Sequence, residues 1–314
     1  ARLRFLHRGV LRRTPPLALL KLLRRRSDDA PVDEEFTAWA TREAGEEGAR
    51  AAARYAAVAT FHHDPGALSA RFTQERLRRA AKLPPEAHYP RGGWDSVIDR
   101  MAGMAWNLGV RVETLARVDD VAEVAHRGPV VVATSLDAAR RLLQDDGLYW
   151  ESGRTTLVDV AFRTRRGDAF AVSDLDRTGW AERFTAQDRT LAPAGQQLVQ
   201  AQLPLSPEES KADGVARAEH LLDLGFDGWR DRLTWRRASV ANGRTGAVDR
   251  PGTTWRDRPA IDRGDDVYLA GDQVAAPGVL SEVSFNSAVE AVALALTRTK
   301  WSSGTRLDLK STSG

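Results

Sequence analysis

Two short apolar runs, each followed by a turn and then a helical pattern, constrain the fold of this chain more than any other feature. The first is the valine run at residues 130–132 in "GPVVVATSLDAARRLL", and the second lies in "DDVYLAGD", residues 265–272. A strand with one solvated face alternates apolar and polar residues, whereas uninterrupted apolar strands that alternate with helices are typical of a parallel sheet covered on both faces. The sequence therefore predicts an α/β fold.

The first third of the chain has the pattern of helices. Few helix-breaking residues interrupt residues 35–85, which predicts helices there. Apolar residues at the spacing of one helical face predict a helix over residues 94–108, ended by Gly109. The stretch "VRVE" at residues 110–113 then predicts a short strand.

The middle of the chain has a different pattern. Segments of partial alternation between residues 154 and 205 predict an antiparallel or mixed sheet. A helix is expected after it, with Ser206 as N-cap and Glu209 at the capping-box position. The stretch "LTWRRASVA" predicts a returning strand.

Composition excludes several classes of function. With 46 Lys and Arg against 43 Asp and Glu, the formal net charge is only +3. The basic residues are scattered, so no nucleic-acid-binding surface is predicted. The chain has no cysteine, which excludes disulfides, thiolate nucleophiles and cysteine metal sites, and which suits a cytoplasmic location. No apolar stretch approaches the ~20 residues that span a bilayer.

A basic amphipathic segment, "PPLALLKLLRRR" at residues 15–26, has two interpretations. In the favoured one its leucines pack on the core and its arginines face solvent. In the other it rests on an anionic membrane surface as a peripheral contact.

A carboxylate follows the second apolar run directly, at Gly271-Asp272, ahead of a Pro-Gly turn and a further helical pattern. In α/β sheets, ligands bind beyond the carboxyl ends of the strands, where helix N-termini offer N–H groups. Gly271 would permit the close approach of a ligand, and Asp272 would accept hydrogen bonds from sugar or polyol hydroxyls. The alternative is that Asp272 only caps the following helix.

This strand, Gly-Asp loop, Pro-Gly turn and helix resemble the carboxyl-terminal FAD motif of the FAD-dependent amine oxidase and phytoene desaturase (phytoene dehydrogenase-like) superfamily. Three more stretches resemble that superfamily in order and spacing. "YPRGGWDSVIDRMAGMAWNLGVRVE" is similar to its Gly-Gly helix and following strand, Val118 falls where it has an adenine-contacting valine, and "VVVATSLDAARRLL" is similar to its central strand and helix. The resemblance covers residues 88–145 and 255–297.

The resemblance implies a two-lobe FAD-dependent oxidoreductase fold, with an incomplete Rossmann-like parallel sheet in a cofactor lobe and a mixed-sheet and helical substrate lobe. The substrate lobe would then consist of a helical part, residues 1–87, and a sheet part, residues 146–254. The cofactor lobe would consist of a middle segment, residues 88–145, and a carboxyl-terminal segment, residues 255–297. Residues 298–314 would form a polar, loosely ordered tail.

The resemblance also implies the cofactor and the reaction. The carboxylate of Asp272 would bind the ribityl chain of FAD, and the start of the last helix would supply the backbone amides of Gly278, Val279 and Leu280. Val118 would contact the adenine. Close approach of the cofactor would be possible at Gly271, Gly92 and Gly93. The reaction would be hydride removal from a C–C or C–N bond of an apolar or amine substrate. No catalytic side chain is assigned, because the flavin carries out the difficult step.

One part of that superfamily's pattern is missing. Its members begin with a strand, a GxGxxG turn and an acidic residue about 20 positions later, which hold the pyrophosphate and the adenosine ribose. No GxGxxG occurs in the 314 residues. The chain is therefore expected to enter the pattern after its first βαβ unit, as a fragment of a longer enzyme or as a chain completed by a partner. The alternative is a truncated or degenerate flavin-free relative that acts as a binding or interaction module.

Other candidate sites are weaker. His62, His63 and Asp64 are metal-ligating residue types, but adjacent side chains on a helix diverge, so no metal site is predicted. GxSxG is missing, so Ser–His–Asp chemistry is not predicted either. Tryptophans such as Trp229 and Trp235 are expected in the core, with an apolar substrate tunnel as the alternative. No oligomeric state is predicted.

Overall fold

The structure is a computed structural model that describes residues 3–82 and 88–302. Its contacts divide the chain into two compact units: unit 1 comprises residues 1–116 and 151–254, and unit 2 comprises residues 117–150 and 255–314. The cofactor lobe expected from the sequence starts at residue 88, whereas these contacts group residues 88–116 with unit 1.

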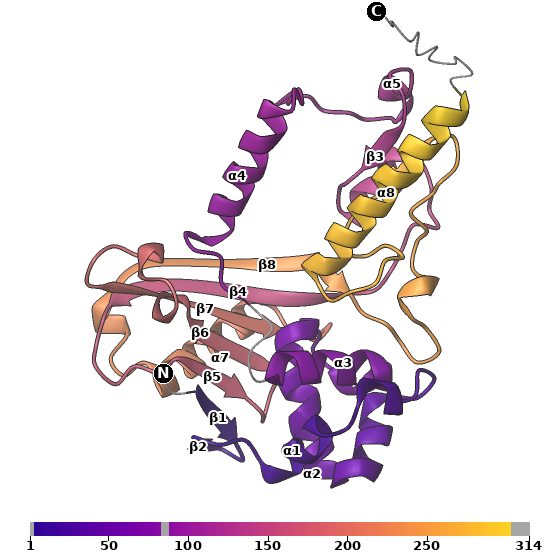
Figure 1. Ribbon diagram of the computed structural model, residues 1–314. Coiled ribbons are helices and arrows are strands. Elements are labelled where there is room, and N and C mark those ends of the chain that lie inside the picture. The colour runs from indigo at the N-terminus through magenta and orange to yellow at the C-terminus, as the bar shows by residue number, and fades with distance from the viewer. Residues whose placement is uncertain (1–2, 83–87, 303–314) are drawn as a thin grey trace, which may run out of the picture. The chain divides into compact units, whose positions relative to one another are not determined.

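Unit 1 is built on a seven-stranded sheet of order β2-β1-β5-β6-β7-β4-β8 (Figure 1). Its strands are β1 Leu3–His7, β2 Val10–Arg12, β4 Ser152–Arg163, β5 Ala171–Asp174, β6 Gly179–Arg183, β7 Gln196–Pro204 and β8 Leu233–Ala247. Neighbouring strands are antiparallel except β1 and β5, which are parallel. The mixed sheet predicted for the middle of the chain is confirmed.

Helix α7, Lys211–Gly225, packs on one face of this sheet (Figure 1). Alternate residues of β4 point to this face, so that Val158 and Phe162 share a buried core with Leu221 of α7. Fully burying such a side chain stabilises the fold by roughly 1.5–3 kcal/mol.

The N-cap of α7 lies one turn later than predicted. Ser210 and Asp213 form the capping box at the start of the helix. Glu209, expected in that role, instead accepts hydrogen bonds from the Ser206 N–H at 3.0 Å and from the Arg217 guanidinium at 3.1 Å. Its carboxylate therefore closes a turn that precedes the helix.

Three helices pack together beside the sheet: α1 Leu17–Leu23, α2 Phe36–Thr60 and α3 Ala70–Ala81. The leucines of the basic N-terminal segment belong to this core, because Leu19 and Leu22 are buried there. Membrane contact through the segment stays a prediction. In the described part of the chain no helix combines the length and the apolar character needed to cross a membrane.

Helix α4, Gly93–Asn107, forms where the apolar spacing predicts it, but its apolar face is not buried. The side chains of Trp94, Met101 and Met104 are each about 60% exposed, and no residue of the helix is buried. The strand predicted at residues 110–113 is not formed either. A strand exists only through hydrogen bonds to a neighbouring strand, and within residues 3–82 and 88–302 no strand pairs with this stretch.

Unit 2 contains a parallel pair of strands, β3 Val130–Val132 and β9 Val267–Leu269, with Val131 opposite Tyr268. Its helices are α5 Ala122–Ala125, α6 Leu136–Leu142 and α8 Ser281–Ser302, of which Figure 1 labels α5 and α8. Both strands bury apolar side chains in one core with α6 and α8. The expected tail begins inside α8, and residues 303–314 lie outside the described residues.

Short 3₁₀ helices lie in the connecting segments: η1 Ser27–Asp29, η2 Pro65–Ala67, η3 Phe184–Ala186, η4 Arg189–Leu191, η5 Arg230–Arg232 and η6 Trp255–Asp257.

Candidate functional site

The Gly271-Asp272 turn lies directly past the carboxyl end of β9, which ends at Leu269. Because β3 runs parallel to β9, both strands end at the same edge of their sheet. Ser287 of α8 is fully buried; its hydroxyl accepts the Gly271 N–H at 3.0 Å and lies 3.1 Å from the Gly271 carbonyl oxygen. One side chain thus fixes the backbone of Gly271 to α8, and Asp272, half-buried, follows that anchored residue.

Residues 278–280 lead into α8, as the sequence predicts. Gly278 has a φ of 119°, and a Cβ atom there would lie 2.7 Å from the Cβ of Glu282, so the position requires glycine. The Val279 N–H donates to the Glu282 carboxylate at 3.0 Å. That carboxylate suits the partial positive charge at a helix start. An anionic ligand that accepted a hydrogen bond from the Val279 amide would have to displace the Glu282 carboxylate.

The other predicted cofactor contacts lie in different units. Val118 is in unit 2, ahead of α5, and is 37% exposed. Gly92 and Gly93 are in unit 1, where the Gly92 N–H donates to the carboxylate of Asp188 at 2.6 Å. Hydrogen bonds from Gly92 and Thr190 lower the pKa of Asp188. All predicted contacts except the glycine pair therefore lie in unit 2, and their role in cofactor binding stays a prediction.

The histidine pair after α2 forms a structural cluster. His62 is buried; its Nδ1 accepts the Asp64 N–H at 3.2 Å, and its Nε2 lies 3.3 Å from Glu151. Arg250 binds the same carboxylate through two hydrogen bonds, of 2.7 and 2.6 Å. In the described ranges no group of three or more His, Cys, Asp or Glu side chains is arranged to hold a metal ion. The cluster joins the end of α2 to the start of β4 and the segment after β8.

This cluster predicts a pH-dependent stability. Although burial raises it, the pKa of Glu151 is lowered to about 2, because the carboxylate accepts hydrogen bonds from His62 and Arg250. A carboxylate with a depressed pKa stabilises the fold above its unfolded value near 4.5, and this contribution is lost as the pH falls from about 4.5 to about 2. Glu151→Gln should lower the free energy of unfolding by about 1–3 kcal/mol at pH 7, and the difference should approach zero near pH 2.

Urea denaturation across this pH range measures the effect. Glu46→Gln, which changes an exposed carboxylate on α2, is the control and should follow the wild-type profile. A Glu151→Gln deficit that stays constant from pH 7 to pH 2 would contradict the assignment of the stability to an ionised Glu151.

A row of polar side chains crosses the unit 1 sheet on the face opposite α7, and it was not predicted from the sequence. Glu182 of β6, Gln200 of β7, Asp159 of β4 and Arg237 of β8 are successive partners in register. Asp159 is 5% exposed and accepts hydrogen bonds from Gln200 at 2.9 Å and from Arg237 at 2.9 and 2.6 Å. Burying a charge is costly unless it is paired, so such a row is a specifically built feature.

A signal for this row is present in the sequence. Asp159 interrupts the apolar run "TLVDVAF", and Gln196, Gln200 and Gln202 fall on one face of the alternating stretch "QQLVQAQLP". Both patterns mark one polar face of a strand.

No protein-family model matches the sequence, and no curated protein is significantly similar to it. Solved structures do match. A protein from Pyrococcus furiosus is 18% identical with a TM-score of 0.66, covering 93% of this chain and 76% of that one. Cyclohexylamine oxidase from Brevibacterium oxydans is 14% identical with a TM-score of 0.65, covering 95% of this chain and 80% of that one. A double mutant of putrescine oxidase with redesigned cofactor binding is 10% identical with a TM-score of 0.66, covering 93% of this chain and 80% of that one.

At these identities the similarity establishes the fold alone. The chain combines a mostly antiparallel, partly parallel sheet with a separate parallel pair of strands and with helices. This mixed α/β arrangement matches the fold of FAD-dependent oxidoreductases, as the sequence predicts.

Proposed function

We propose that this chain carries part of the flavin site, together with the substrate lobe, of an FAD-dependent oxidoreductase that removes a hydride from a C–C or C–N bond of an apolar or amine substrate. The observation that carries the proposal is the Gly271-Asp272 turn, which lies past the end of a parallel strand and is anchored to the following helix by Ser287. Ligands of α/β sheets bind at this kind of position. Two of the structurally similar proteins are amine oxidases by name, which supports the amine as one substrate class.

The residues of the turn fit a flavin dinucleotide in their chemistry. The Asp272 carboxylate is an acceptor for polyol hydroxyls, and the amides that open α8 suit a phosphate group. Space is open beside Gly271, because a Cβ atom there would meet nothing closer than the Thr134 carbonyl oxygen at 3.9 Å. When bound, the flavin would supply the hydride acceptor. Ser287 would hold the turn in place, and Glu282 would release the Val279 amide to the incoming anion.

The test is the visible absorption spectrum of the purified chain after incubation with FAD and desalting. The expected result is a retained, protein-shifted flavin band. Asp272→Ala should weaken FAD binding at least about tenfold, because a hydrogen bond to a charged group contributes about 1.5–3 kcal/mol. The circular dichroism spectrum should be unchanged, since the variant removes a half-buried side chain from a turn.

Asp265→Ala, which removes an exposed carboxylate before β9, is the matched control and should retain flavin like the wild type. Equal flavin retention by Asp272→Ala and the wild type would refute the role of Asp272. A wild-type chain that is folded but colourless would favour the flavin-free binding module.

A further inference from the structure

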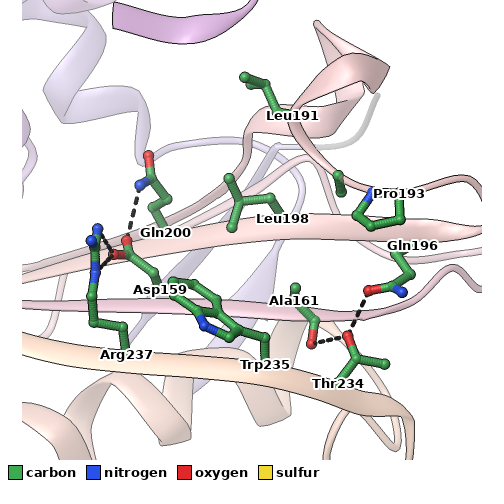
Figure 2. A pocket seen from close by; sticks show the side chains of 11 residues that line it. Asp159, Ala161, Leu191, Pro193, Gln196, Leu198, Gln200, Thr234, Trp235 and Arg237 are labelled. Atoms are coloured by element: carbon green, nitrogen blue, oxygen red, sulfur yellow. Dashed lines mark hydrogen bonds and ion pairs between the residues drawn. The ribbon is translucent and has the colours of Figure 1, made fainter. Parts of the chain in front are cut away.

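A cavity of about 450 Å³ opens on the face of the unit 1 sheet opposite α7 (Figure 2). It is formed by β4, β7, β8, the end of η4 and the segment that follows it, so it lies wholly within unit 1. Cavities of a few hundred Å³ with a few polar groups in an apolar wall are typical of small-molecule sites. Of the predictions made from the sequence, only the alternative of an apolar tunnel lined by tryptophans such as Trp235 concerns this cavity.

Most of the cavity wall is apolar. Ala161, Leu191, Pro193 and Leu198 line it, together with the indole of Trp235. Figure 2 shows these side chains around one hollow. Trp235 remains 47% exposed, although a side chain of this size is usually mostly buried. A flat or aliphatic ligand body would cover this apolar surface and gain the free energy of its burial.

One end of the cavity is charged and is formed by Asp159, Gln200 and Arg237, whereas Thr234 and Gln196, which hydrogen-bond to each other at 2.6 Å, line the other end. Both carboxylate oxygens of Asp159 are engaged: Gln200 donates to Oδ1, and the Nε and Nη2 of Arg237 donate to Oδ2. Figure 2 shows the carboxylate held between the two side chains. Asp159 therefore orients the guanidinium, and because it is only 5% exposed and already accepts three hydrogen bonds, it offers little to an incoming ligand.

Arg237 has donors left over. Within residues 3–82 and 88–302, its Nη1 makes no hydrogen bond to a protein acceptor, and its side chain is 64% exposed. A guanidinium fixed along one edge presents its other N–H groups in the fork geometry that matches a carboxylate. A ligand ammonium would instead meet the positive charge of Arg237, beside a nearly buried carboxylate that is already paired with that cation.

We propose that this cavity binds a small monocarboxylic acid with an apolar body. The carboxylate pairs with the outer edge of Arg237, and the apolar body lies against Trp235 and Leu198. The inference goes beyond the proposed function, because the cavity belongs to unit 1 and its occupation requires no flavin. A failure of flavin binding therefore leaves it intact, and its own failure leaves the flavin proposal intact.

The experiment uses the full chain without added flavin, with 3-phenylpropionate as the probe and 3-phenylpropylamine as its cationic counterpart. Calorimetry gives the affinity, and quenching of tryptophan fluorescence reports contact with Trp235. We expect 3-phenylpropionate to bind with quenching and 3-phenylpropylamine to bind at least about tenfold more weakly. Arg237→Gln should reduce the affinity for 3-phenylpropionate by about tenfold or more.

The neighbouring arginine provides a matched control. Arg236 precedes Arg237 on β8 but pairs with Glu219 of α7 at 2.7 Å, on the other face of the sheet. Arg236→Gln should bind 3-phenylpropionate within about twofold of the wild type, because it leaves the cavity unchanged. If Arg237→Gln disturbs the fold by leaving Asp159 without its cation, Arg237→Lys keeps the charge, loses the fork, and should still weaken binding.

Three results would overturn the inference. They are the lack of any binding of 3-phenylpropionate, equal or tighter binding of 3-phenylpropylamine, and an affinity that is the same in the wild type and in both folded Arg237 variants.

Discussion

Replacing Asp168 by alanine is expected to lower the free energy of unfolding by about 3–5 kcal/mol. The carboxylate is only 2% exposed and accepts hydrogen bonds from Nη1 and Nη2 of the Arg232 guanidinium, at 2.9 and 3.0 Å. Arg232 is itself 13% exposed and stacks 4.9 Å from the ring of Phe162, inside the core that packs on α7. Removing Asp168 therefore leaves this largely buried cation without its counter-charge, with the backbone carbonyl oxygens of Arg163, Asp227 and Gly228 as its remaining hydrogen-bond acceptors in the described part of the chain. Urea denaturation at pH 7, followed by circular dichroism, measures the loss.

A nearby ion pair supplies the control. Asp227 pairs with Arg165 at 2.8 Å, but the two side chains are 85% and 54% exposed. Asp227→Ala should therefore lower the free energy of unfolding by no more than about 1 kcal/mol, because exposed ion pairs contribute little to stability. The double substitution Asp168→Ala with Arg232→Met should recover part of the loss, because it removes the stranded charge as well. If Asp168→Ala were as stable as Asp227→Ala, the prediction would be wrong, because solvent would then stabilise the charge of Arg232 in place of Asp168.

The elements that could be predicted from the sequence are those specified by local periodicity. The valine run of β3 and the apolar run of β9 are too uniformly apolar for an exposed sheet, and they do pair in parallel. Gly271-Asp272 was found in the same way, because the turn, the strand before it and the helix after it are adjacent in sequence. Local patterns thus place a candidate ligand position without any knowledge of distant contacts.

The features that could not be predicted from the sequence depend on contacts with residues that are distant in the sequence. The apolar spacing of α4 specifies a helix with a face that can pack, but it does not specify what covers that face, and Trp94 and Met101 are exposed. Residues 110–113 have the composition of a strand and no neighbouring strand in the described ranges. The start of α7 was misplaced because two serines each have an acid three residues later, and contacts with Arg217 decide how Glu209 is used.

The charged end of the unit 1 cavity could not be predicted for a related reason. Gln200 lies 41 positions from Asp159, and Arg237 lies 78 positions from it. Only the register of β7 and β8 against β4 brings the three side chains together. A shift of one residue in either pairing would turn one partner to the opposite face. Alternation marks each strand's polar face, but the combination depends on the tertiary fold.

Gly278→Ala is expected to have the largest effect on unit 2, lowering the free energy of unfolding by about 2–4 kcal/mol. Its φ of 119° is strained for alanine, and the new Cβ atom would lie 2.7 Å from the Cβ and 3.2 Å from the carbonyl carbon of Glu282. Neither atom is the movable end of a side chain, so the first turn of α8 must shift. In the proposed function this shift also moves the amides that open α8, and we expect FAD binding to weaken at least about tenfold.

Gly264→Ala separates the clash from the cost of the backbone conformation. Gly264 has a φ of 82°, and a Cβ atom there would meet nothing within 4 Å, so this variant carries the conformational cost alone, about 1 kcal/mol. Urea denaturation and FAD titration of both variants give the comparison. If the two variants lose equal stability, α8 tolerates a side chain at residue 278. If Gly278→Ala is destabilised but binds FAD like Gly264→Ala, the fold of unit 2 depends on this glycine, whereas cofactor binding does not use the start of α8.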